Sequence, residues 1–177
     1  IEEFERLARM ISEMLFLAKA EHGLAITNCE PVELAREVRE LFEFYEALAE
    51  EKRIRLQLVG EGRVRGDRLM LRRALSNLLS NALRHTPREG SVTVTIAPED
   101  AEVVLSVENP GDTVPAQHLA RLFERFYRAD PSRQHGTGEG TGLGLAITQA
   151  IVRAHRGHTS ATSRAGRTRF SIRLPCA

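Results

Sequence analysis

The stretch GTGEGTGLGLA, residues 136–146, places glycine at every second position from Gly136 to Gly144 and leads directly into apolar, helix-forming residues. Glycine loses more conformational freedom on folding than any other residue, so this run is costly unless the backbone takes a shape that side chains would obstruct. One such shape is a phosphate cradle, in which backbone N–H groups at a helix N-terminus face an anion. The run matches neither the P-loop nor the dinucleotide-binding pattern. By itself it predicts either a phosphate cradle or a flexible hinge.

A second polar pattern lies on the helix-like stretch DRLMLRRALSNLLSNALRH, residues 67–85. Asn77 and Asn81 are one helical turn apart, and Arg84 and His85 continue the same stripe, while the leucines point elsewhere. Asparagine is a poor residue inside a helix because its amide competes for backbone hydrogen bonds. Its amide oxygen is a hard ligand that suits Mg²⁺ shared with substrate phosphates. The stripe therefore predicts a magnesium-nucleotide site, and a solvated helix face is the alternative.

Hydrophobic periodicity predicts the elements that must position these residues. The opening stretch IEEFERLARMISEMLFLAKAEHG predicts one amphipathic helix that ends near Gly23. Further helices are predicted over 34–49, 67–85 and 145–155, with strands over 53–59, 91–97, 102–109, 158–164 and 168–175. Turns at Glu99-Asp100 and Ala165-Gly166 join two pairs of these strands. A long loop over residues 110–140 is expected to form a lid that carries a short helix over LARLFERFY, residues 119–127.

The order of these elements lacks a strict βαβ alternation, which favours an α/β fold: a two-layer sandwich of a mixed sheet with helices on one face. One long amphipathic helix precedes this sandwich. We therefore divide the chain into a helical unit at residues 1–25 and a sheet-containing domain at residues 26–177, with the lid at about 110–140.

Composition excludes several classes of protein. The chain has 177 residues and 42% hydrophobic residues, enough for one ordinary globular core. Lys and Arg number 25 against 24 for Asp and Glu, so no basic field predicts nucleic-acid binding. The two cysteines, Cys29 and Cys176, are too far apart in sequence to indicate a zinc site or a disulfide framework. No apolar run approaches the roughly 20 residues of a membrane span, so we expect a soluble piece, cut from a longer chain.

Together these stretches resemble the catalytic, ATP-binding domain of sensor histidine kinases, within the wider ATPase superfamily that includes gyrase and Hsp90-type proteins. NLLSNALRHTP is similar to the family's asparagine box, VENPGDTV to its first glycine box, LFERFYRAD to its phenylalanine box and GTGLGLAI to its second glycine box. The four boxes occur in the family's order, and the resemblance covers nearly the whole chain. The resemblance implies a Bergerat-type fold with ATP and Mg²⁺ as cofactors. ENPG together with RLFERFYRADPSRQ resembles the branch that responds to heavy metals such as copper and silver.

The resemblance also implies roles for individual residues. Asn81 would be the main Mg²⁺ ligand with Asn77 assisting, Arg84 would take the place of a phosphate-contacting lysine, and His85 would flank the nucleotide. Asn109 would face adenine where the family has aspartate, and an amide gives up a charge-assisted hydrogen bond, so weaker nucleotide binding is expected. The implied ATP-binding residues are Asn77, Asn81, Arg84, His85, Asn109, Gly111, Arg128, Gly140, Thr141, Gly142, Leu143, Gly144, Leu145 and Thr168.

Three aromatic and basic residues of the lid also fit the resemblance. Arg128 in FYRAD would reach the ATP phosphates, a task that suits a permanently charged side chain with several donors. A solvated lid charge is the alternative. Phe123 and Phe126, three residues apart on one predicted helical face, would pin the lid to the domain, and ordinary core packing predicts the same spacing.

The first helix resembles the second helix of the family's dimerisation and phosphoacceptor hairpin. None of the six histidines is followed by the acidic residue and downstream proline of the phosphoacceptor motif, so we expect no phosphate-accepting histidine in this chain. The resemblance implies a homodimer formed through a helix bundle and a response regulator as partner. It further implies a cytoplasmic domain of an inner-membrane protein, while the balanced charge already argues against a nucleic-acid partner.

Three functional classes stay open at this point: a histidine kinase catalytic module, a hydrolytic ATPase of the same superfamily, and a nucleotide-free interaction module. Hydrolytic relatives place a glutamate at the position of Asn77 to activate water. An amide lacks that basicity, which favours transfer to histidine. The glycine run argues against the third class, and the amide at Asn109 keeps it open.

Overall fold

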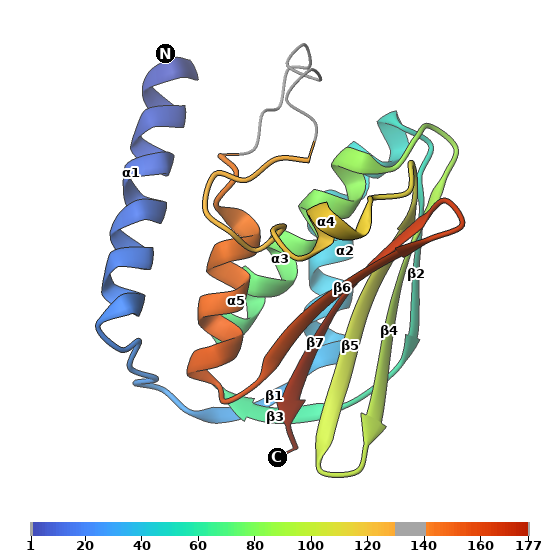
Figure 1. Cartoon of the computed structure of the whole chain (residues 1–177). Helices are drawn as coiled ribbons and strands as arrows, with labels where there is room; N and C mark the ends of the chain where they lie inside the picture. Colours follow the sequence, from blue (N-terminus) through green and yellow to red (C-terminus); the bar gives the residue numbers. More distant parts are fainter. Residues whose placement is uncertain (1, 130–140, 177) are drawn as a thin grey trace.

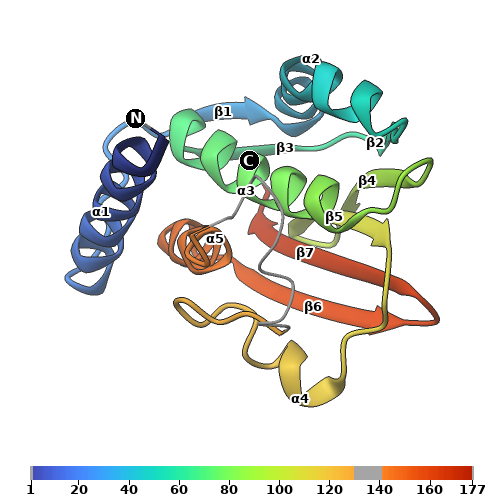
Figure 2. The ribbon, with the colours of Figure 1, turned by 90° about the horizontal axis from the view of Figure 1, so that it is seen from above.

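The computed structural model describes residues 2–129 and 141–176, which form two layers (Figures 1 and 2). One layer is a five-stranded sheet in the order β2-β4-β5-β7-β6. Its strands are β2 (Arg55–Gly60), β4 (Ser91–Glu99), β5 (Glu102–Pro110), β7 (Arg167–Pro175) and β6 (His158–Arg164). The β2–β4 pair is parallel and the other pairs are antiparallel. The predicted α/β sandwich with a mixed sheet is confirmed.

Three helices cover one face of this sheet: α2 (Leu34–Glu51), α3 (Arg68–His85) and α5 (Gly144–Ala154). The helix α3 begins where the Asp67 side chain accepts a hydrogen bond from the Met70 N–H at 3.1 Å, an N-cap that satisfies one free backbone donor. The α3 leucines predicted to point away from the polar stripe are at most 1% exposed: Leu75, Leu78, Leu79 and Leu83. Burial of this apolar face against the sheet is the main stabilisation of the two layers.

The first helix, α1 (Glu2–Glu21), runs beside α5 at the edge of the helical layer (Figure 2). Leu17 is 3% exposed against the domain, and the Arg73 guanidinium lies 4.4 Å from the centre of the Phe16 ring. Phe4 and Leu15 stay exposed, so the domain covers only part of the apolar stripe of α1. Within the described ranges, no helix has both the length and the apolar character that crossing a membrane requires.

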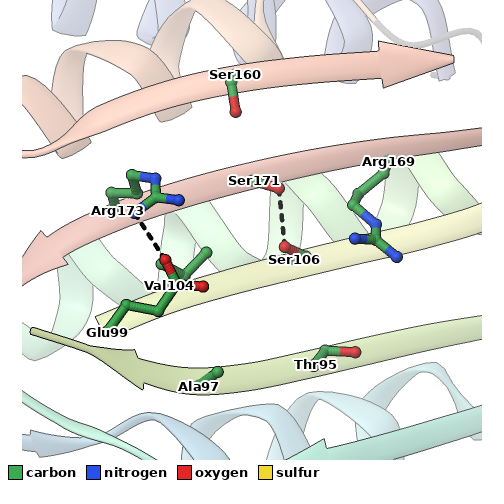
Figure 3. Close-up of a pocket in the computed structure, with 9 residues that line it drawn as sticks. All are labelled: Thr95, Ala97, Glu99, Val104, Ser106, Ser160, Arg169, Ser171 and Arg173. Atoms are coloured by element: carbon green, nitrogen blue, oxygen red, sulfur yellow. Dashed lines mark hydrogen bonds and ion pairs between the residues drawn. The ribbon is translucent and has the colours of Figure 1, made fainter. Parts of the chain in front are cut away.

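The sheet face opposite the helices is open and carries a shallow hollow of about 240 Å³ (Figure 3). Ser106 and Ser171 lie 2.8 Å apart in it and bond to each other. Arg173, which also lines the hollow, is paired with Glu99 at 3.0 Å. The hollow contains none of the predicted site residues. The hollow therefore lies apart from the predicted site, on the side of the sheet away from the helices.

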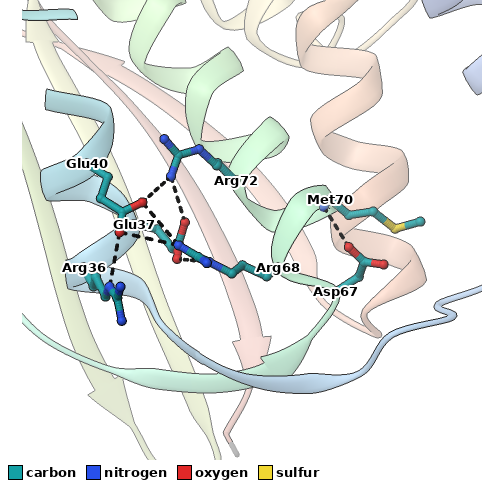
Figure 4. Close-up of polar contacts among 7 residues, drawn as sticks. All are labelled: Arg36, Glu37, Glu40, Asp67, Arg68, Met70 and Arg72. Atoms are coloured by element: carbon teal, nitrogen blue, oxygen red, sulfur yellow. Dashed lines mark hydrogen bonds and ion pairs between the residues drawn. The ribbon is translucent and has the colours of Figure 1, made fainter. Parts of the chain in front are cut away.

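An ion-pair network joins α2 to the first half of α3 (Figure 4). Glu37, which is 2% exposed, accepts hydrogen bonds from Arg68 at 2.6 Å and from Arg72 at 3.2 Å. Arg72 also donates to Glu40 at 2.6 Å. A buried carboxylate is costly unless it is paired, so this network fixes the two helices to each other.

A two-stranded antiparallel sheet, which the sequence analysis did not predict, precedes α2 and α3. It consists of β1 (Glu30–Glu33) and β3 (Arg63–Gly66). Val32 and Val64 are paired in it and are 2% and 1% exposed. Each strand has four residues, which is too short for an alternating pattern to be distinguished from a loop.

The lid carries a short helix as predicted, but the predicted position over residues 119–127 is wrong. The short helix α4 is Ala116–Leu119, and turns follow it. Phe126 has φ of 59°, in the left-handed region, and its N–H donates to the Gly142 carbonyl at 3.0 Å. The two phenylalanines therefore do not share a helical face: Phe123 packs edge-on against Phe170, and Phe126 is 50% exposed. The rest of the predicted lid, including Gly140, lies outside the described residues.

Candidate functional site

The asparagine and glycine stretches meet where the middle of α3 faces the start of α5. The Asn77 side-chain amide donates to the Gly144 carbonyl at 3.0 Å. This bond uses the amide nitrogen of Asn77. The side-chain oxygen takes no part in it and can serve as a hydrogen-bond acceptor or a metal ligand. Asn81 lies one turn further along α3 and is half-buried. Residues that are far apart in the sequence are thus brought to one place.

The glycine stretch has a backbone shape that requires glycine at one position. Gly142 has φ of 76°, and a Cβ there would lie 3.1 Å from the Phe126 Cα. The Leu143 N–H is 3.3 Å from the Thr141 hydroxyl, and the Leu143 side chain is fully buried. The chain then enters α5 at Gly144, so the first N–H groups of that helix and its partial positive charge lie next to Asn77. This is the geometry of an anion-binding helix start.

Two arginines lie at the end of this region. Arg84 is in the last turn of α3, and Arg128 is in the lid. Partial burial and then the like charge of Arg128 lower the pKa of Arg84 from its ordinary value, although the side chain keeps contact with solvent. Two guanidinium groups held near each other repel. An anion bound between them would attract both and so offset that repulsion.

The end of α3 also adjoins the first glycine box, VENPGDTV. His85 is the last residue of α3, and a Cβ at Gly111 would lie 3.4 Å from the His85 carbonyl oxygen. The Gly111 N–H donates to the Gly166 carbonyl at 2.9 Å, which ties this segment to the β6–β7 turn. The exposed His85 side chain is therefore at the rim of the region.

Asn109 and Thr168 form a cross-strand pair at the inner face of the sheet. Their side chains are 3% and 7% exposed, and they continue the inward-facing rows of β5 and β7. The Asn109 amide donates to the Pro110 carbonyl at 3.0 Å, and the Thr168 hydroxyl lies 2.9 Å from that of Ser163. The Asn109 side-chain oxygen remains the acceptor suited to an exocyclic amino group.

The residues present fit a magnesium ion that is shared with a phosphate ligand. Across residues 2–129 and 141–176, no group of three or more His, Cys, Asp or Glu side chains is placed to hold a metal. The candidate ligands are the amide oxygens of Asn77 and Asn81, beside the glycine stretch. Mg²⁺ keeps several waters and binds through few protein ligands together with substrate phosphates, which matches this donor set.

The helix α1 contributes two contacts to this region that the sequence does not predict. Glu13 of α1 accepts a hydrogen bond from the Thr141 hydroxyl in the glycine stretch. Glu21 at the end of α1 pairs with Arg125 of the lid at 2.5 Å. Both contacts join residues more than a hundred positions apart, and charged residues on a helix face give no sequence signal for such a partner.

Comparisons with known proteins identify the family of this chain. Residues 66–177 match the family described as histidine kinase-, DNA gyrase B- and HSP90-like ATPase. Sensor histidine kinase CusS of Escherichia coli O157:H7 is 53% identical over 99% of this chain and 36% of CusS. Probable sensor kinase SilS of Salmonella typhimurium is 43% identical over 99% of this chain and 36% of SilS. Full-length ShkA in complex with AMPPNP has a TM-score of 0.86 at 27% identity, over 99% of this chain and 37% of ShkA.

The chain spans little more than a third of the length of CusS and SilS. These relatives confirm the predicted resemblance to sensor histidine kinases of the heavy-metal branch. The family match extends from the start of α3 through the glycine stretch to the last strand, and so includes the residues of the candidate site. The chain belongs to the family of histidine kinase-, DNA gyrase B- and HSP90-like ATPases, in which it is the ATP-binding catalytic portion of a sensor histidine kinase.

Proposed function

We propose that this chain binds Mg²⁺-ATP between α3 and the lid and transfers the γ-phosphate to a histidine on a dimerisation helix outside the chain. The observation that carries this proposal is the hydrogen bond from Asn77 to the Gly144 carbonyl. It joins the helix with the predicted magnesium ligands to the loop with the predicted phosphate-binding N–H groups. The AMPPNP bound by the similar kinase ShkA supports an adenine nucleotide as the ligand.

Each part of the site has a distinct task in this proposal. Asn81 and Asn77 hold Mg²⁺, which supplies charge neutralisation on the phosphates. Backbone N–H groups from Thr141 to Leu145 and the cations of Arg84 and Arg128 hold the phosphate chain. The pair formed by Asn109 and Thr168 faces adenine, flanked by His85 and Gly111.

The chemistry of transfer follows from positioning. An imidazole nitrogen attacks the γ-phosphorus in line, the bond to the leaving oxygen breaks, and ADP leaves while the phosphoryl group stays on histidine. Asn77 has no basicity with which to activate water, so hydrolysis has no catalytic group at this position. The chain therefore favours transfer over hydrolysis.

The wider role is that of a kinase in a two-component system. In this proposal α1 is the second helix of the dimerisation hairpin, and its exposed apolar residues pack in a homodimeric four-helix bundle. The phosphohistidine then passes its phosphoryl group to an aspartate of a response regulator. The similarity to CusS and SilS supports a cytoplasmic portion of an inner-membrane protein that responds to metal ions.

Two measurements on the chain test this proposal. A fluorescent ATP analogue should bind saturably in the presence of Mg²⁺ and more weakly in EDTA. With γ-labelled ATP the chain should take up no acid-labile, base-stable label, while a longer chain with the preceding helix should take it up. Label on one of the six histidines of this chain would show that α1 is wrongly assigned. Absence of nucleotide binding would favour an interaction module, and rapid phosphate release would favour a hydrolase.

A further inference from the structure

We infer that the buried His155 is a positioning residue for the nucleotide site, an inference that rests on the proposed nucleotide function. His155 follows the last residue of α5, at the opposite end of that helix from the glycine stretch. It therefore does not contact the nucleotide. Its role is to set how far α5 is shifted along α3, and so where the glycine stretch lies relative to Asn77.

The hydrogen bonds of His155 define its chemical state. The side chain is 6% exposed, and Nδ1 lies 2.7 Å from the Ile151 carbonyl oxygen, which can only accept, so Nδ1 carries the proton. The Asp67 backbone N–H donates to Nε2 at 3.0 Å, so Nε2 must be the unprotonated nitrogen. Both ring nitrogens are satisfied by the neutral imidazole, and one of these bonds crosses from α5 to the start of α3.

Gly66 makes the approach of this ring possible. A Cβ on Gly66 would lie 2.4 Å from His155 Cδ2 and 2.6 Å from Nε2. Any side chain at position 66 would thus displace the imidazole from the Asp67 N–H. Because Asp67 is also the N-cap of α3, the ring contacts the residue that defines where α3 begins.

The other end of the same helix pair is held by the bond from Asn77 to the Gly144 carbonyl. Between the two ends, the buried Thr148 hydroxyl lies 3.0 Å from the Gly144 carbonyl and 3.4 Å from the Ala74 carbonyl, so it also connects α5 to α3. The terminal bonds are about 15 Å apart along the antiparallel helices, given the rise of an α-helix. Two bonds at this separation resist both sliding and tilting.

The remaining buried side chains do not supply such a constraint. Ala74, Ile147 and Ile151 are fully buried and apolar, and apolar contacts have no directional preference. Hydrogen bonds do, because they weaken steeply as donor and acceptor lose alignment. A shift of about 1 Å at the glycine stretch is enough to impair phosphate positioning. The polar contacts at His155 and Thr148 are therefore the features that hold the two halves of the site in register.

The test compares two substitutions at His155 in this chain. His155→Leu removes the acceptor, whereas His155→Gln places an amide oxygen within reach of the Asp67 N–H. Each variant is titrated with a fluorescent ATP analogue and Mg²⁺, well below its melting temperature and with its fold verified by circular dichroism. We expect affinity to fall about tenfold in His155→Leu and to stay within about twofold of the wild type in His155→Gln. His158→Leu, at an exposed histidine of β6, is the matched control and should bind normally.

A second pair of variants keeps the test decisive if His155→Leu does not fold. Thr148→Val keeps the shape and removes the hydroxyl, and Thr148→Ser keeps the hydroxyl. Weaker binding by the valine variant alone supports the inference. Folded His155→Leu or Thr148→Val chains that bind as the wild type does would overturn it, as would equal losses in His155→Leu and His155→Gln. Failure of the wild type itself to bind nucleotide would instead overturn the proposed function, and the inference with it.

Discussion

Arg84 at the end of α3 has its pKa lowered first by burial and then by the like charge of Arg128 in the lid. The two residues come from separate motifs, and nothing in their spacing along the chain predicts that they interact. Like charges held together destabilise the chain without ligand and stabilise a complex with an anion. This relationship leads to the first expected outcome for the proposed nucleotide site.

Removal of either cation should weaken nucleotide binding. A hydrogen bond to a charged group contributes about 1.5–3 kcal/mol, so Arg84→Ala and Arg128→Ala should each raise the Kd for Mg²⁺-ATP about 10- to 100-fold. The melting temperature without nucleotide should not fall, because a repulsion is removed. Titration with a fluorescent ATP analogue measures the first effect, with Arg39→Ala on the exposed side of α2 as control. Unchanged affinity would mean that the phosphates lie elsewhere.

The magnesium dependence of binding should disappear in Asn81→Ala. The substitution removes one amide oxygen from the half-buried side of α3 and leaves its leucine face intact, so the fold should persist. Binding is measured with Mg²⁺ and with EDTA, and the ratio of the two affinities should approach one. Asn28→Ala, an exposed asparagine before β1, is the control. If the ratio of the two affinities in Asn81→Ala equals that of the wild type, Asn81 is not a magnesium ligand.

Asn109→Asp should bind ATP more tightly than the wild type and be less stable without it. A carboxylate accepts a charge-assisted hydrogen bond from the adenine amino group, roughly twice as strong as one to a neutral amide. The same carboxylate is buried and lacks the amide donor that now bonds to Pro110, which destabilises the unliganded chain. Affinities for ATP and GTP and the melting temperature are measured together. An equal change for both nucleotides would show that Asn109 does not face adenine.

Glu13→Gln should strengthen nucleotide binding. In the unliganded chain the Glu13 carboxylate of α1 accepts the hydrogen bond of the Thr141 hydroxyl, and a phosphate at the glycine stretch would meet this negative charge. We expect the affinity for Mg²⁺-ATP to rise by about two- to fivefold, the scale of a partly exposed charge interaction. Glu5→Gln, at an exposed glutamate of α1, should leave affinity unchanged. Weaker binding by Glu13→Gln would contradict this competition.

The ion-pair network between α2 and α3 predicts an acid-sensitive contribution to stability. Hydrogen bonds from Arg72 and Arg36 lower the pKa of Glu40 below its ordinary value of 4.5. The folded chain therefore holds the carboxylate ionised more strongly than the unfolded chain does, so the stabilisation is complete above pH 4.5 and is lost as the pH falls below it. Melting temperatures between pH 7 and 3 should fall less steeply in Glu40→Gln than in the wild type. Parallel profiles would exclude this linkage.

The sequence alone determined the elements and the chemical character of the motifs, because both depend on local information. Apolar periodicity defined α1, α2, α3 and α5 and the strands of the large sheet, and Asp67 marked the start of α3. The same information predicted a mixed sheet with helices on one face. It also indicated which amide, arginine and glycine residues are suited to magnesium and phosphate.

The tertiary structure decided which of these residues meet, because the contacts join distant parts of the chain and depend on packing that no local pattern records. The short lid helix lies at Ala116–Leu119 with turns after it, and the paired strands β1 and β3 are too short to show a period. The bond from Asn77 to Gly144 and the contact of Glu13 with Thr141 exist only after α1, α3 and α5 have packed. In the same way, a histidine at the end of one helix becomes a structural partner of the start of another.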